Sequence, residues 1–396
     1  MGSMESGKTH GNPIGEPSVI SKSEGFTSRL QSAVIPQQVE LVLLQLTSST
    51  EIVLRTTTGN LEGDSFDHLE FKEAPVPKCG ENEVLVKLHA ASLNYRDLVI
   101  PKEMHPFPLD LPVIPGSDGA GEVVEAGSKV KHFKKGDKVV TLFNQLHQYG
   151  AVDDLSAKSG LGGVMDGTLR QYGVFNENGV VKAPRNLNFL ESSSLTCAAL
   201  TSWNALYGLK PLKPGEIVLV QGTGGVSMFA LQFAKAAGAT VIATTSSEAK
   251  AKKLKELGAD HVINYKTNFN WGDTARSLTP ENAGVDHIVE VGGAGTLTQS
   301  LKCIKYEGTI SIIGFLGGVD PKGQPPILEA LSNICTIRGV YVGSKALMTD
   351  MIKAIEVNNI HPVIDEKVFS LDQTREAYEY MVSHPREFLI EHKVLT

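Results

Sequence analysis

Residues Ile217–Lys250 read IVLVQGTGGVSMFALQFAKAAGATVIATTSSEAK. An apolar run over 217–220 leads into a glycine-rich turn, an amphipathic stretch over 226–237 follows, and a second apolar run covers 240–243. This order predicts the strand, helix and second strand of one βαβ unit. A helix that opens straight after such a turn directs its unpaired N–H groups and its positive dipole end at the turn, so a pyrophosphate can bind there.

The glycine-rich turn is therefore the first candidate for a nucleotide site, because glycine lets the backbone approach a ligand closely. An ordinary buried strand and turn would also contain a Gly-x-Gly pair. Three features favour nucleotide binding: the turn lies between a strand and a helix, a second strand follows at the right interval, and a cluster of hydroxyls and a lysine closes the unit. The expected contacts are Gly222, Thr223, Gly224, Gly225, Val226 and Ser227.

The end of the second strand indicates which dinucleotide binds. Folds specific for NAD place an Asp or Glu about 20 residues after the turn, where it holds the ribose hydroxyls. Here residues 244–247 read TTSS and Lys250 follows. Hydroxyls and a lysine accept a 2′-phosphate, so we expect NADP, with Thr245, Ser246 and Lys250 as contacts. The alternative is a solvated helix start with surface lysines.

Composition limits the class of protein. The 396 residues, 41% of them hydrophobic, suffice for two domains with large cores. A net charge of −7 and a pI of about 5.9 argue against nucleic acid or an anionic membrane as the main partner. Four dispersed cysteines argue against a disulfide framework or a structural zinc site. With no membrane-length apolar run and no signal-peptide pattern, we expect a cytoplasmic protein.

The chain divides into four parts by pattern. Residues 1–38 are rich in Ser, Gly and Pro and predict a mobile leader; their single arginine and three acids argue against a transit peptide. Residues 39–185 carry short strands punctuated by Gly and Pro, which predicts an all-β, barrel-like domain. In residues 186–345, helical patterns, one of them over 191–207, alternate with apolar strands and predict a doubly wound parallel sheet of the Rossmann type. Residues 346–396 are expected to return to the first domain.

Seven segments stand in a distinctive order along residues 51–396. They read EVLVKLHAASLNYRD, PVIPGSDGAGEVVEAGSKVKHFKKGDKV, GTLRQYGVF, LTCAALTSWNALYG, VQGTGGVS, ELGADHVINY and GTISIIGFLGG. Together they resemble the medium-chain dehydrogenase/reductase superfamily. The resemblance implies an α/β fold, with a Rossmann-type domain beside a β-rich GroES-like domain, and an oxidoreductase that acts on a small-molecule substrate with a nicotinamide cofactor. Ser227 stands where the third glycine of the turn is expected.

The resemblance also bears on metal content. Zinc-dependent alcohol dehydrogenases of this superfamily hold a catalytic metal with a Cys near the first segment and a His in a Gly-His-Glu triplet. The matching stretches here begin at Ser92 and at Gly116-Ser117-Asp118, so neither soft ligand is present. The four-cysteine structural lobe is missing too. The chain is therefore similar to the zinc-independent quinone oxidoreductase and enoyl reductase branches, and we expect no metal site.

The segment LNYRD supplies the expected catalytic residues. It is similar to the LNxxD segment of those reductases, in which the Asn faces the nicotinamide, so Asn94 is a candidate donor to a carbonyl or to the carboxamide. Tyr95 offers a phenol as donor or proton source, or is a packed aromatic at a helix start. Arg96 and Asp97 are expected to cap the helix or pair locally, and a catalytic role for either is the alternative. The long loop over 144–167 is expected to shape specificity.

Further cofactor contacts follow from the resemblance. Thr201 matches the LTAWxAL helix and Tyr265 matches the INY segment; a local cap and an aromatic plug are the respective alternatives. Residues at the carboxyl ends of two later strands lie where such sheets bind ligands, although tight turns would look the same. These positions are Gly292, Gly293, Gly314 and Phe315.

These features predict an NADPH-dependent, zinc-free oxidoreductase that transfers hydride to an activated double bond or a quinone. A metal-free alcohol dehydrogenase or ketoreductase is one alternative, and a non-catalytic NADPH-binding protein is another. Similar proteins pair through an edge strand of the nucleotide sheet. The apolar run over 334–342 is the expected strand for a homodimer.

Overall fold

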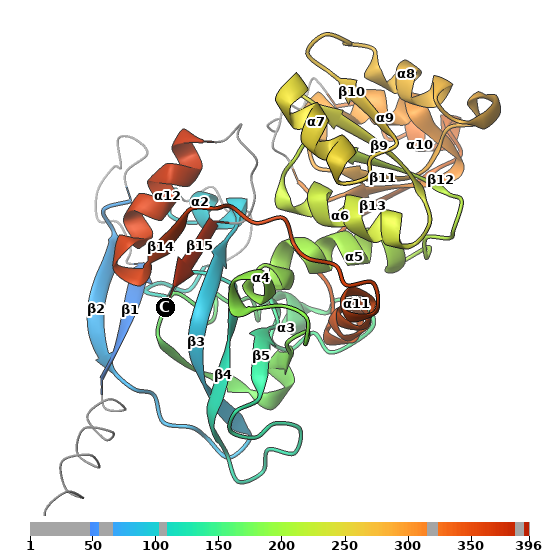
Figure 1. Ribbon diagram of the computed structural model, residues 1–396. Coiled ribbons are helices and arrows are strands. Elements are labelled where there is room, and N and C mark those ends of the chain that lie inside the picture. The colour runs from blue at the N-terminus through green and yellow to red at the C-terminus, as the bar shows by residue number, and fades with distance from the viewer. Residues whose placement is uncertain (1–47, 55–65, 103–108, 315–323, 385–391, 396) are drawn as a thin grey trace, which may run out of the picture. The chain divides into compact units, whose positions relative to one another are not determined.

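The computed structural model describes residues 48–54, 66–102, 109–314, 324–384 and 392–395 (Figure 1). The expected leader and the candidate residue Phe315 lie outside this part of the chain. Among the described residues no helix is long and apolar enough to cross a membrane.

A six-stranded parallel sheet forms the first unit. Its strand order is β10-β9-β8-β11-β12-β13, the order of a doubly wound dinucleotide-binding sheet, so the predicted Rossmann-type unit is confirmed. The strands are β8 (Ile217–Gln221), β9 (Thr240–Thr245), β10 (His261–Asn264), β11 (Val285–Glu290), β12 (Ile304–Ile312) and β13 (Thr336–Gly339).

The central strands β8 and β9 are buried on both faces, and their sequences are correspondingly rich in apolar residues. Side chains alternate between the faces. Val218 and Val220 pack into the core that contains Phe229 of α6, whereas Leu219 packs on the other face with Trp271 of α8. The helices that accompany the sheet are α5 (Leu200–Tyr207), α6 (Gly225–Ala236), α7 (Glu248–Glu256), α8 (Trp271–Ser277), α9 (Leu297–Cys303), α10 (Glu329–Ser332) and α11 (Lys345–Val357).

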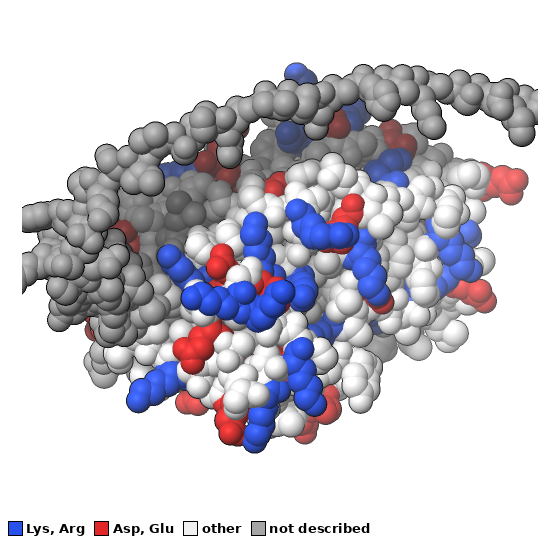
Figure 2. Space-filling model, turned by 60° about the horizontal axis from the view of Figure 1, so that its bottom comes forward, with Lys and Arg blue, Asp and Glu red and all other residues white. Residues whose placement is uncertain are grey.

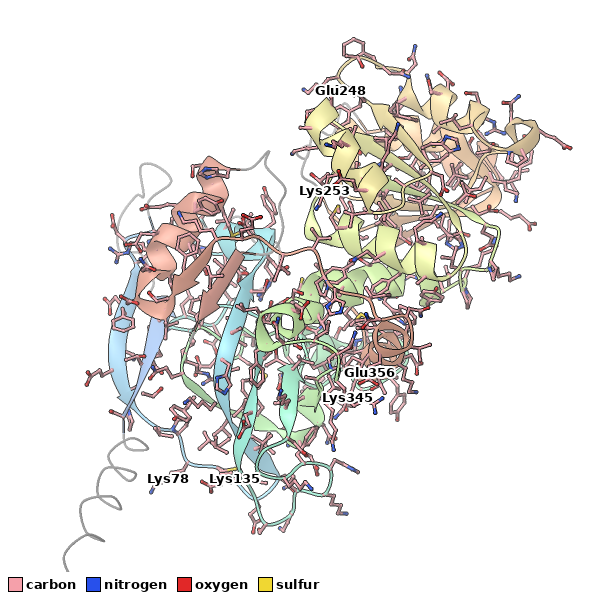
Figure 3. All side chains as sticks on the ribbon, viewed as in Figure 1. Lys78, Lys135, Glu248, Lys253, Lys345 and Glu356 are labelled. Carbon is pink, nitrogen blue, oxygen red and sulfur yellow. The ribbon has the colours of Figure 1, made fainter. Side chains whose placement is uncertain are left out.

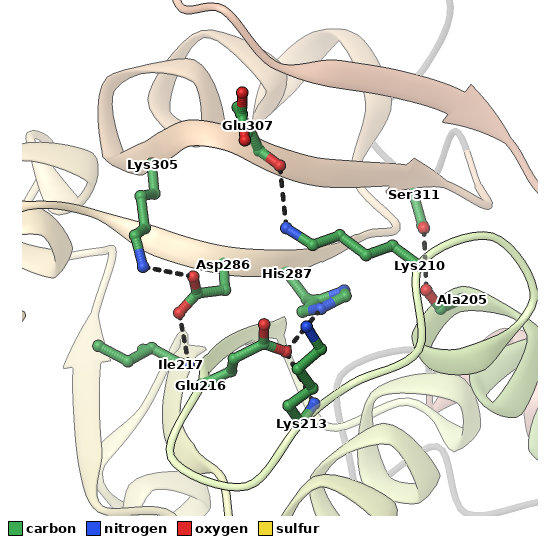
Figure 4. Close-up of polar contacts among 10 residues, drawn as sticks. All are labelled: Ala205, Lys210, Lys213, Glu216, Ile217, Asp286, His287, Lys305, Glu307 and Ser311. Atoms are coloured by element: carbon green, nitrogen blue, oxygen red, sulfur yellow. Dashed lines mark hydrogen bonds and ion pairs between the residues drawn. The ribbon is translucent and has the colours of Figure 1, made fainter.

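The amino end of the central strands is fixed by polar contacts of buried side chains (Figure 4). Asp286 accepts a hydrogen bond of 2.9 Å from the Ile217 N–H and another of 2.7 Å from Lys305 Nζ. Beside it, His287 Nε2 lies 3.2 Å from Glu216 Oε2. These contacts set the register of β8 against β11, and thereby the position of the glycine turn at the opposite end.

A seven-stranded sheet forms the second unit, and its pairs are antiparallel except that of β14 with β15. The path runs β14-β15-β3-β4-β5-β7, and β6 also pairs with β3. These strands are β3 (Glu83–Leu93), β4 (Asp118–Ala126), β5 (Lys138–Thr141), β6 (Tyr172–Asn176), β7 (Val180–Lys182), β14 (Val368–Ser370) and β15 (His392–Leu395). The C-terminal strand therefore joins the sheet of the N-terminal half (Figure 1).

Smaller elements complete the second unit. Strands β1 (Ser48–Leu54) and β2 (Leu69–Pro75) pair antiparallel. The remaining α-helices are α2 (Tyr95–Val99), α3 (Asp154–Ala157), α4 (Phe189–Ser193) and α12 (Thr374–Ser383). Single 3₁₀ turns lie at Glu177–Gly179, Pro280–Asn282, Gly293–Gly295 and Leu371–Gln373.

Helix α11 is tied to the chain at both ends, near the labelled side chains Lys345 and Glu356 (Figure 3). Arg185 donates to both carboxylate oxygens of Glu356, at 3.0 and 2.9 Å. Lys345 Nζ donates to the carbonyl of Glu177 at 3.1 Å. Segments before and after the parallel sheet are thus joined by polar contacts as well as by β-pairing.

Two predicted elements differ from the structure. The single helix expected over 191–207 is interrupted, because a wide π-helical turn (Leu195–Ala199) separates α4 from α5. The strand expected over 334–342 is shortened to β13, because Ile334 and Val342 adopt φ values of 47° and 48° that end the extended backbone on both sides.

Candidate active site

The glycine turn has the geometry of an anion site. Gly222 has φ 75°, which favours glycine, and its N–H donates to the carbonyl of Thr244 at 2.8 Å. Helix α6 begins at Gly225, and its N-cap residue Gly224 has no side chain with which to cap the first N–H groups. These N–H groups and the positive end of the helix dipole are directed at the turn.

Ser227 replaces the third glycine of the turn without leaving a polar atom unsatisfied. It is buried, and its hydroxyl donates to the carbonyl of Gln221 at 2.6 Å. The side chain therefore ties the first turn of α6 to the end of β8, where a glycine would only have allowed close packing.

The end of β9 collects the residues predicted to hold the adenosine phosphate. Thr245 is buried, and its hydroxyl has no hydrogen-bond partner among the described residues. Tyr265 donates its N–H to the carbonyl of Thr245 at 2.9 Å, so the two predicted contacts adjoin. Ser247 caps α7 through the Lys250 N–H at 3.4 Å. Glu248, labelled in Figure 3, accepts from the Asn264 amide at 3.0 Å.

A buried carboxylate that the sequence analysis missed organises the ends of β8 and β11. Glu290 accepts hydrogen bonds from Gln221 Nε2 at 2.7 Å and Ser300 Oγ at 2.5 Å, from Thr296 Oγ1, and from the N–H groups of Gly292 and Gly293 at 3.0 and 3.1 Å. The predicted contacts Gly292 and Gly293 are thus held beside the glycine turn. The sequence feature that could have identified Glu290 is its position as a polar residue at the end of the strand β11.

The predicted contact Gly314 also lies at the carboxyl end of the parallel sheet, after β12. A Cβ at Gly314 would stand 2.9 Å from the carbonyl oxygen of Val291, so the chain after β12 passes close to the chain after β11. This close approach gives the glycine a packing reason besides any contact with a ligand.

Helix α5 connects the carboxyl end of the parallel sheet to the second unit. Thr201 is buried on α5, and its neighbour Ser202 donates to the carbonyl of Val226 at 2.6 Å. One turn earlier, the Cys197 N–H donates to Asp118 Oδ2 at 2.9 Å. A single segment therefore contacts both the start of α6 and the start of β4.

The start of β4 carries an unusual carboxyl group. Ser92 of β3 pairs in register with Asp118, and Ser117 Oγ lies 2.5 Å from Asp118 Oδ1. Burial raises the pKa of Asp118 to about 7, although the Ser117 hydroxyl and the Cys197 N–H lower it; the nearby Asp97 carboxyl raises it further. The described residues contain no group of three His, Cys, Asp or Glu side chains that could hold a metal ion.

Helix α2 presents the predicted catalytic residues. The Asn94 N–H donates to Asp97 Oδ2 at 2.7 Å, so Asp97 caps the helix as expected. Burial raises the pKa of Asp97 despite the neighbouring Arg96. The Asn94 amide lies close enough to Asp118 to lower its pKa. Tyr95 is 45% exposed on the same helix.

The arrangement matches known families. Residues 80–185 match the alcohol dehydrogenase GroES-like domain, and residues 225–357 match the zinc-binding dehydrogenase family. A zinc-type alcohol dehydrogenase-like protein of Schizosaccharomyces pombe is 49% identical over 81% of this chain and 94% of its own. The chain belongs to the medium-chain dehydrogenase/reductase superfamily.

Other members of the superfamily extend the comparison. The chloroplastic quinone oxidoreductase QR1 of Triphysaria versicolor is 32% identical over 78% of this chain and 89% of its own. The crystal structure of an NAD-dependent alcohol dehydrogenase superposes with a TM-score of 0.76, at 30% identity, over 88% of this chain and 99% of that one. The predicted fold class and superfamily are confirmed, and the chain is an oxidoreductase of this superfamily.

The superfamily implies a nicotinamide dinucleotide, and the residues present fit one. The uncapped start of α6 supplies N–H donors for a pyrophosphate, and the unpartnered Thr245 hydroxyl supplies a buried polar atom at the end of β9. Whether that dinucleotide is NAD or NADP depends on the residues after Thr245.

Proposed function

We propose that this protein is an NADPH-dependent reductase of activated double bonds or quinones that works without zinc. The observation that carries the proposal is the polar end of β3 and β4. Ser92, Ser117 and Asp118 meet there, and this set lacks the thiolate and imidazole that zinc prefers. Without Lewis acidity, reduction of an activated acceptor is the reaction that hydrogen-bond donors can support.

Bound NADPH would supply a hydride and leave as NADP⁺. In an enone, a C–H bond then forms at the β-carbon, the C=C pair moves to make the enolate, and the carbonyl pair moves onto oxygen. A proton from solvent completes the reduced product. The chain's own task is to hold the acceptor and to stabilise negative charge on its oxygen.

The acceptor class is tested by NADPH consumption with quinones, enones, aldehydes and ketones. We expect turnover of quinones or enones that exceeds turnover of simple ketones by at least tenfold. Turnover of simple carbonyls or alcohols alone would favour the alcohol dehydrogenase alternative, which the names of several relatives support. NADPH binding without oxidation by any acceptor would favour a non-catalytic binding protein.

The preference for NADPH rests on the end of β9. The hydroxyls of Thr245 and Ser246, together with Lys250 at the start of α7, offer hydrogen bonds and a positive charge to a 2′-phosphate. Lys250→Ala should weaken NADPH binding about tenfold and leave NADH binding unchanged, as measured by quenching of protein fluorescence. Lys255→Ala, an exposed change on the same helix, is the control. Equal affinity of the wild type for both cofactors would reject the preference.

Zinc independence is tested separately. Prolonged treatment with a strong chelator should leave the rate of NADPH oxidation unchanged, and elemental analysis of the active protein should find less than about 0.1 zinc per chain. Stoichiometric zinc that is lost together with activity would overturn this part of the proposal.

We also propose a homodimer formed through the edge strand β13. Apolar side chains gather beside this edge, with Ile327 89%, Leu331 74% and Ile334 55% exposed. An unpaired edge flanked by apolar surface favours pairing with a second copy. Leu331→Asp should shift the mass measured by light scattering from dimer to monomer. A monomeric wild type would reject the proposal.

A small-molecule acceptor and a cytoplasmic location complete the proposal. On the face drawn in Figure 2, acidic side chains lie among the basic ones, which does not favour a polyanionic partner. The four cysteines form no disulfide, as expected in a reducing compartment. Fractionation of cells that express the protein checks the location.

A further inference from the structure

We propose that Arg96 and Asn144 form the site that binds the acceptor's carbonyl oxygen, with the guanidinium stabilising the negative charge that forms there. The inference rests on the proposed function, because it names the groups that take the place of a metal in that reaction. It takes up the alternative role for Arg96 in place of the expected local cap or pair.

The first observation is the environment of the guanidinium. Arg96 Nε and Nη1 are buried and have no hydrogen-bond partner among the described residues. Its carbon Cζ lies 4.8 Å from the centre of the Phe143 ring, so one face of the cation rests on an aromatic surface. Guanidinium groups present five N–H donors in a fixed plane, and buried donors are nearly always satisfied. Two unsatisfied donors therefore point to a ligand oxygen.

The second observation is independent of the first. Asn144 is completely buried, and neither Oδ1 nor Nδ2 has a partner in the described part of the chain. The amide and the guanidinium both border Gly160, since a Cβ at Gly160 would stand 3.6 Å from Asn144 Oδ1 and 3.9 Å from Arg96 Nη2. Its Nδ2 can donate to the same oxygen, and its Oδ1 can accept from a hydroxyl or amide of the ligand.

The neighbouring charges leave the guanidinium available. Asp97 is the adjacent acid, and its Oδ2 accepts from the Asn94 N–H instead. No ion pair of Arg96 occurs within 4.0 Å among the described residues. Burial raises the pKa values of Tyr341 and Tyr378, the Asp97 carboxyl raises that of Tyr378 further, and the Arg96 charge lowers both only in part, so neither phenol carries a negative charge near neutral pH.

The backbone fixes this pair in place. The Leu161 N–H donates to the Phe143 carbonyl at 3.1 Å, and Asn144 forms an isolated antiparallel bridge with Gly160, so the segment after β5 is held against residues 160–163. A Cβ at Gly163 would stand 2.6 Å from Arg96 Nη2, so a side chain at this position would displace the guanidinium from where it lies. The donors are therefore held in position before a ligand arrives, as stabilisation of a developing oxyanion requires.

The kinetic test compares variants of the full-length protein on 1,4-naphthoquinone and a simple enone. Arg96→Met should lower kcat/KM about 100-fold or more while NADPH affinity stays within threefold, because an oxyanion donor acts on the transition state. Arg96→Lys keeps the charge without the planar fork and should recover part of the loss. Lys158→Met, an exposed change in the same loop, is the control and should match the wild type.

Binding of 4-nitrophenol gives a readout without turnover. Its phenolate should bind the wild type with the phenol pKa lowered, seen as absorbance near 400 nm at a pH where the free phenol is largely neutral. Arg96→Met should remove this signal, and Arg96→Lys should keep most of it. Thermal melts establish that each variant is folded.

The outcomes separate the two proposals. Normal kcat/KM of Arg96→Met with quinone and enone would overturn the role of Arg96 and leave the reductase function standing. A wild type that reduces no acceptor but binds phenolate through Arg96 would overturn the function and leave the oxyanion site standing. Equal loss of NADPH binding and acceptor turnover in Arg96→Met would overturn the assignment to the acceptor.

Discussion

Two buried polar sites in this protein, Glu290 and the pair Arg96 and Asn144, differ in the number of hydrogen-bond partners that they have. Glu290, at the carboxyl end of the parallel sheet, accepts five hydrogen bonds and is fully buried. Arg96 and Asn144, in the second unit, retain buried donors and an acceptor without partners among the described residues. Complete satisfaction indicates a structural role, whereas incomplete satisfaction indicates a site that something else completes.

This difference in hydrogen bonding indicates that Glu290 contributes to stability, whereas Arg96 and Asn144 contribute to function. A satisfied network in a region of low dielectric constrains one conformation, and removal of its centre leaves several donors unpaired. An unsatisfied pair costs stability, and is retained at functional sites because a ligand uses it. Substitution of Glu290 should therefore lower mainly the free energy of unfolding, whereas substitution of Arg96 or Asn144 should lower mainly the activity.

The largest effect should come from Glu290→Leu. The change leaves two hydroxyls, an amide and two backbone N–H groups without their acceptor, so we expect the free energy of unfolding to fall by about 3–5 kcal/mol. Urea denaturation measures it, and Glu256→Ala on the exposed side of α7 is the control, with an expected change below about 0.5 kcal/mol. A fall in the free energy of unfolding of less than about 1 kcal/mol would contradict the structural role of Glu290.

The next effect should come from Asp118→Asn, as a function of pH. The pKa of Asp118 is raised in the folded state to about 7 from 3.8, so the folded protein binds more protons than the unfolded chain between these values. Stability that Asp118 contributes is thus present at low pH and lost as pH rises from about 4 to 7. Asparagine carries no proton to lose, so the variant should gain relative stability over this range, by up to about 4 kcal/mol.

Urea denaturation of wild type and Asp118→Asn at pH 4.5, 5.5 and 6.5 measures this difference. Other titrating groups cancel in the comparison, apart from the neighbouring Asp97, whose pKa is also raised. A difference that stays constant across the three pH values would show that Asp118 is ionised throughout.

The smallest effect on stability should come from Asn144→Leu. Leucine has a similar volume and removes two unsatisfied polar atoms, so the free energy of unfolding should stay the same or rise by up to about 1 kcal/mol. The same variant should lose about tenfold in kcat/KM for the acceptor, because a donor to its oxygen is gone. If the variant were less stable and fully active, Asn144 would have a structural role like that of Glu290 and no role in binding the acceptor.

Much of the fold could be predicted from local patterns. The βαβ unit around Gly222 and the alternation of strands and helices that follows it agree with the structure, because apolar runs and helical periods are local signals. The interruption at Leu195–Ala199 was not predictable in the same way, since nothing in the apolar pattern of that segment marks a π-helical turn. The ends of β13 depend on positive φ values at Ile334 and Val342, which β-branched residues rarely adopt.

The site was predictable only in part, for a related reason. Glycines and hydroxyls at strand ends are visible in the sequence, and the structure gathers those near Gly222, Thr245 and Gly292 at one sheet edge. Arg96 and Asn144 lie 48 positions apart and carry no motif that links them. What singles them out is the absence of partners, which only the folded chain reveals.

Gly160 and Gly163 give engineers two very different positions. At Gly163 an added Cβ would stand 2.6 Å from Arg96 Nη2 and would displace the guanidinium. At Gly160 an added methyl meets its nearest neighbours at 3.6 Å, an ordinary contact distance, and it stands directly beside Asn144 and Arg96. Gly160 is therefore the position at which residues of increasing size could narrow the range of acceptors while the charge that activates them stays in place.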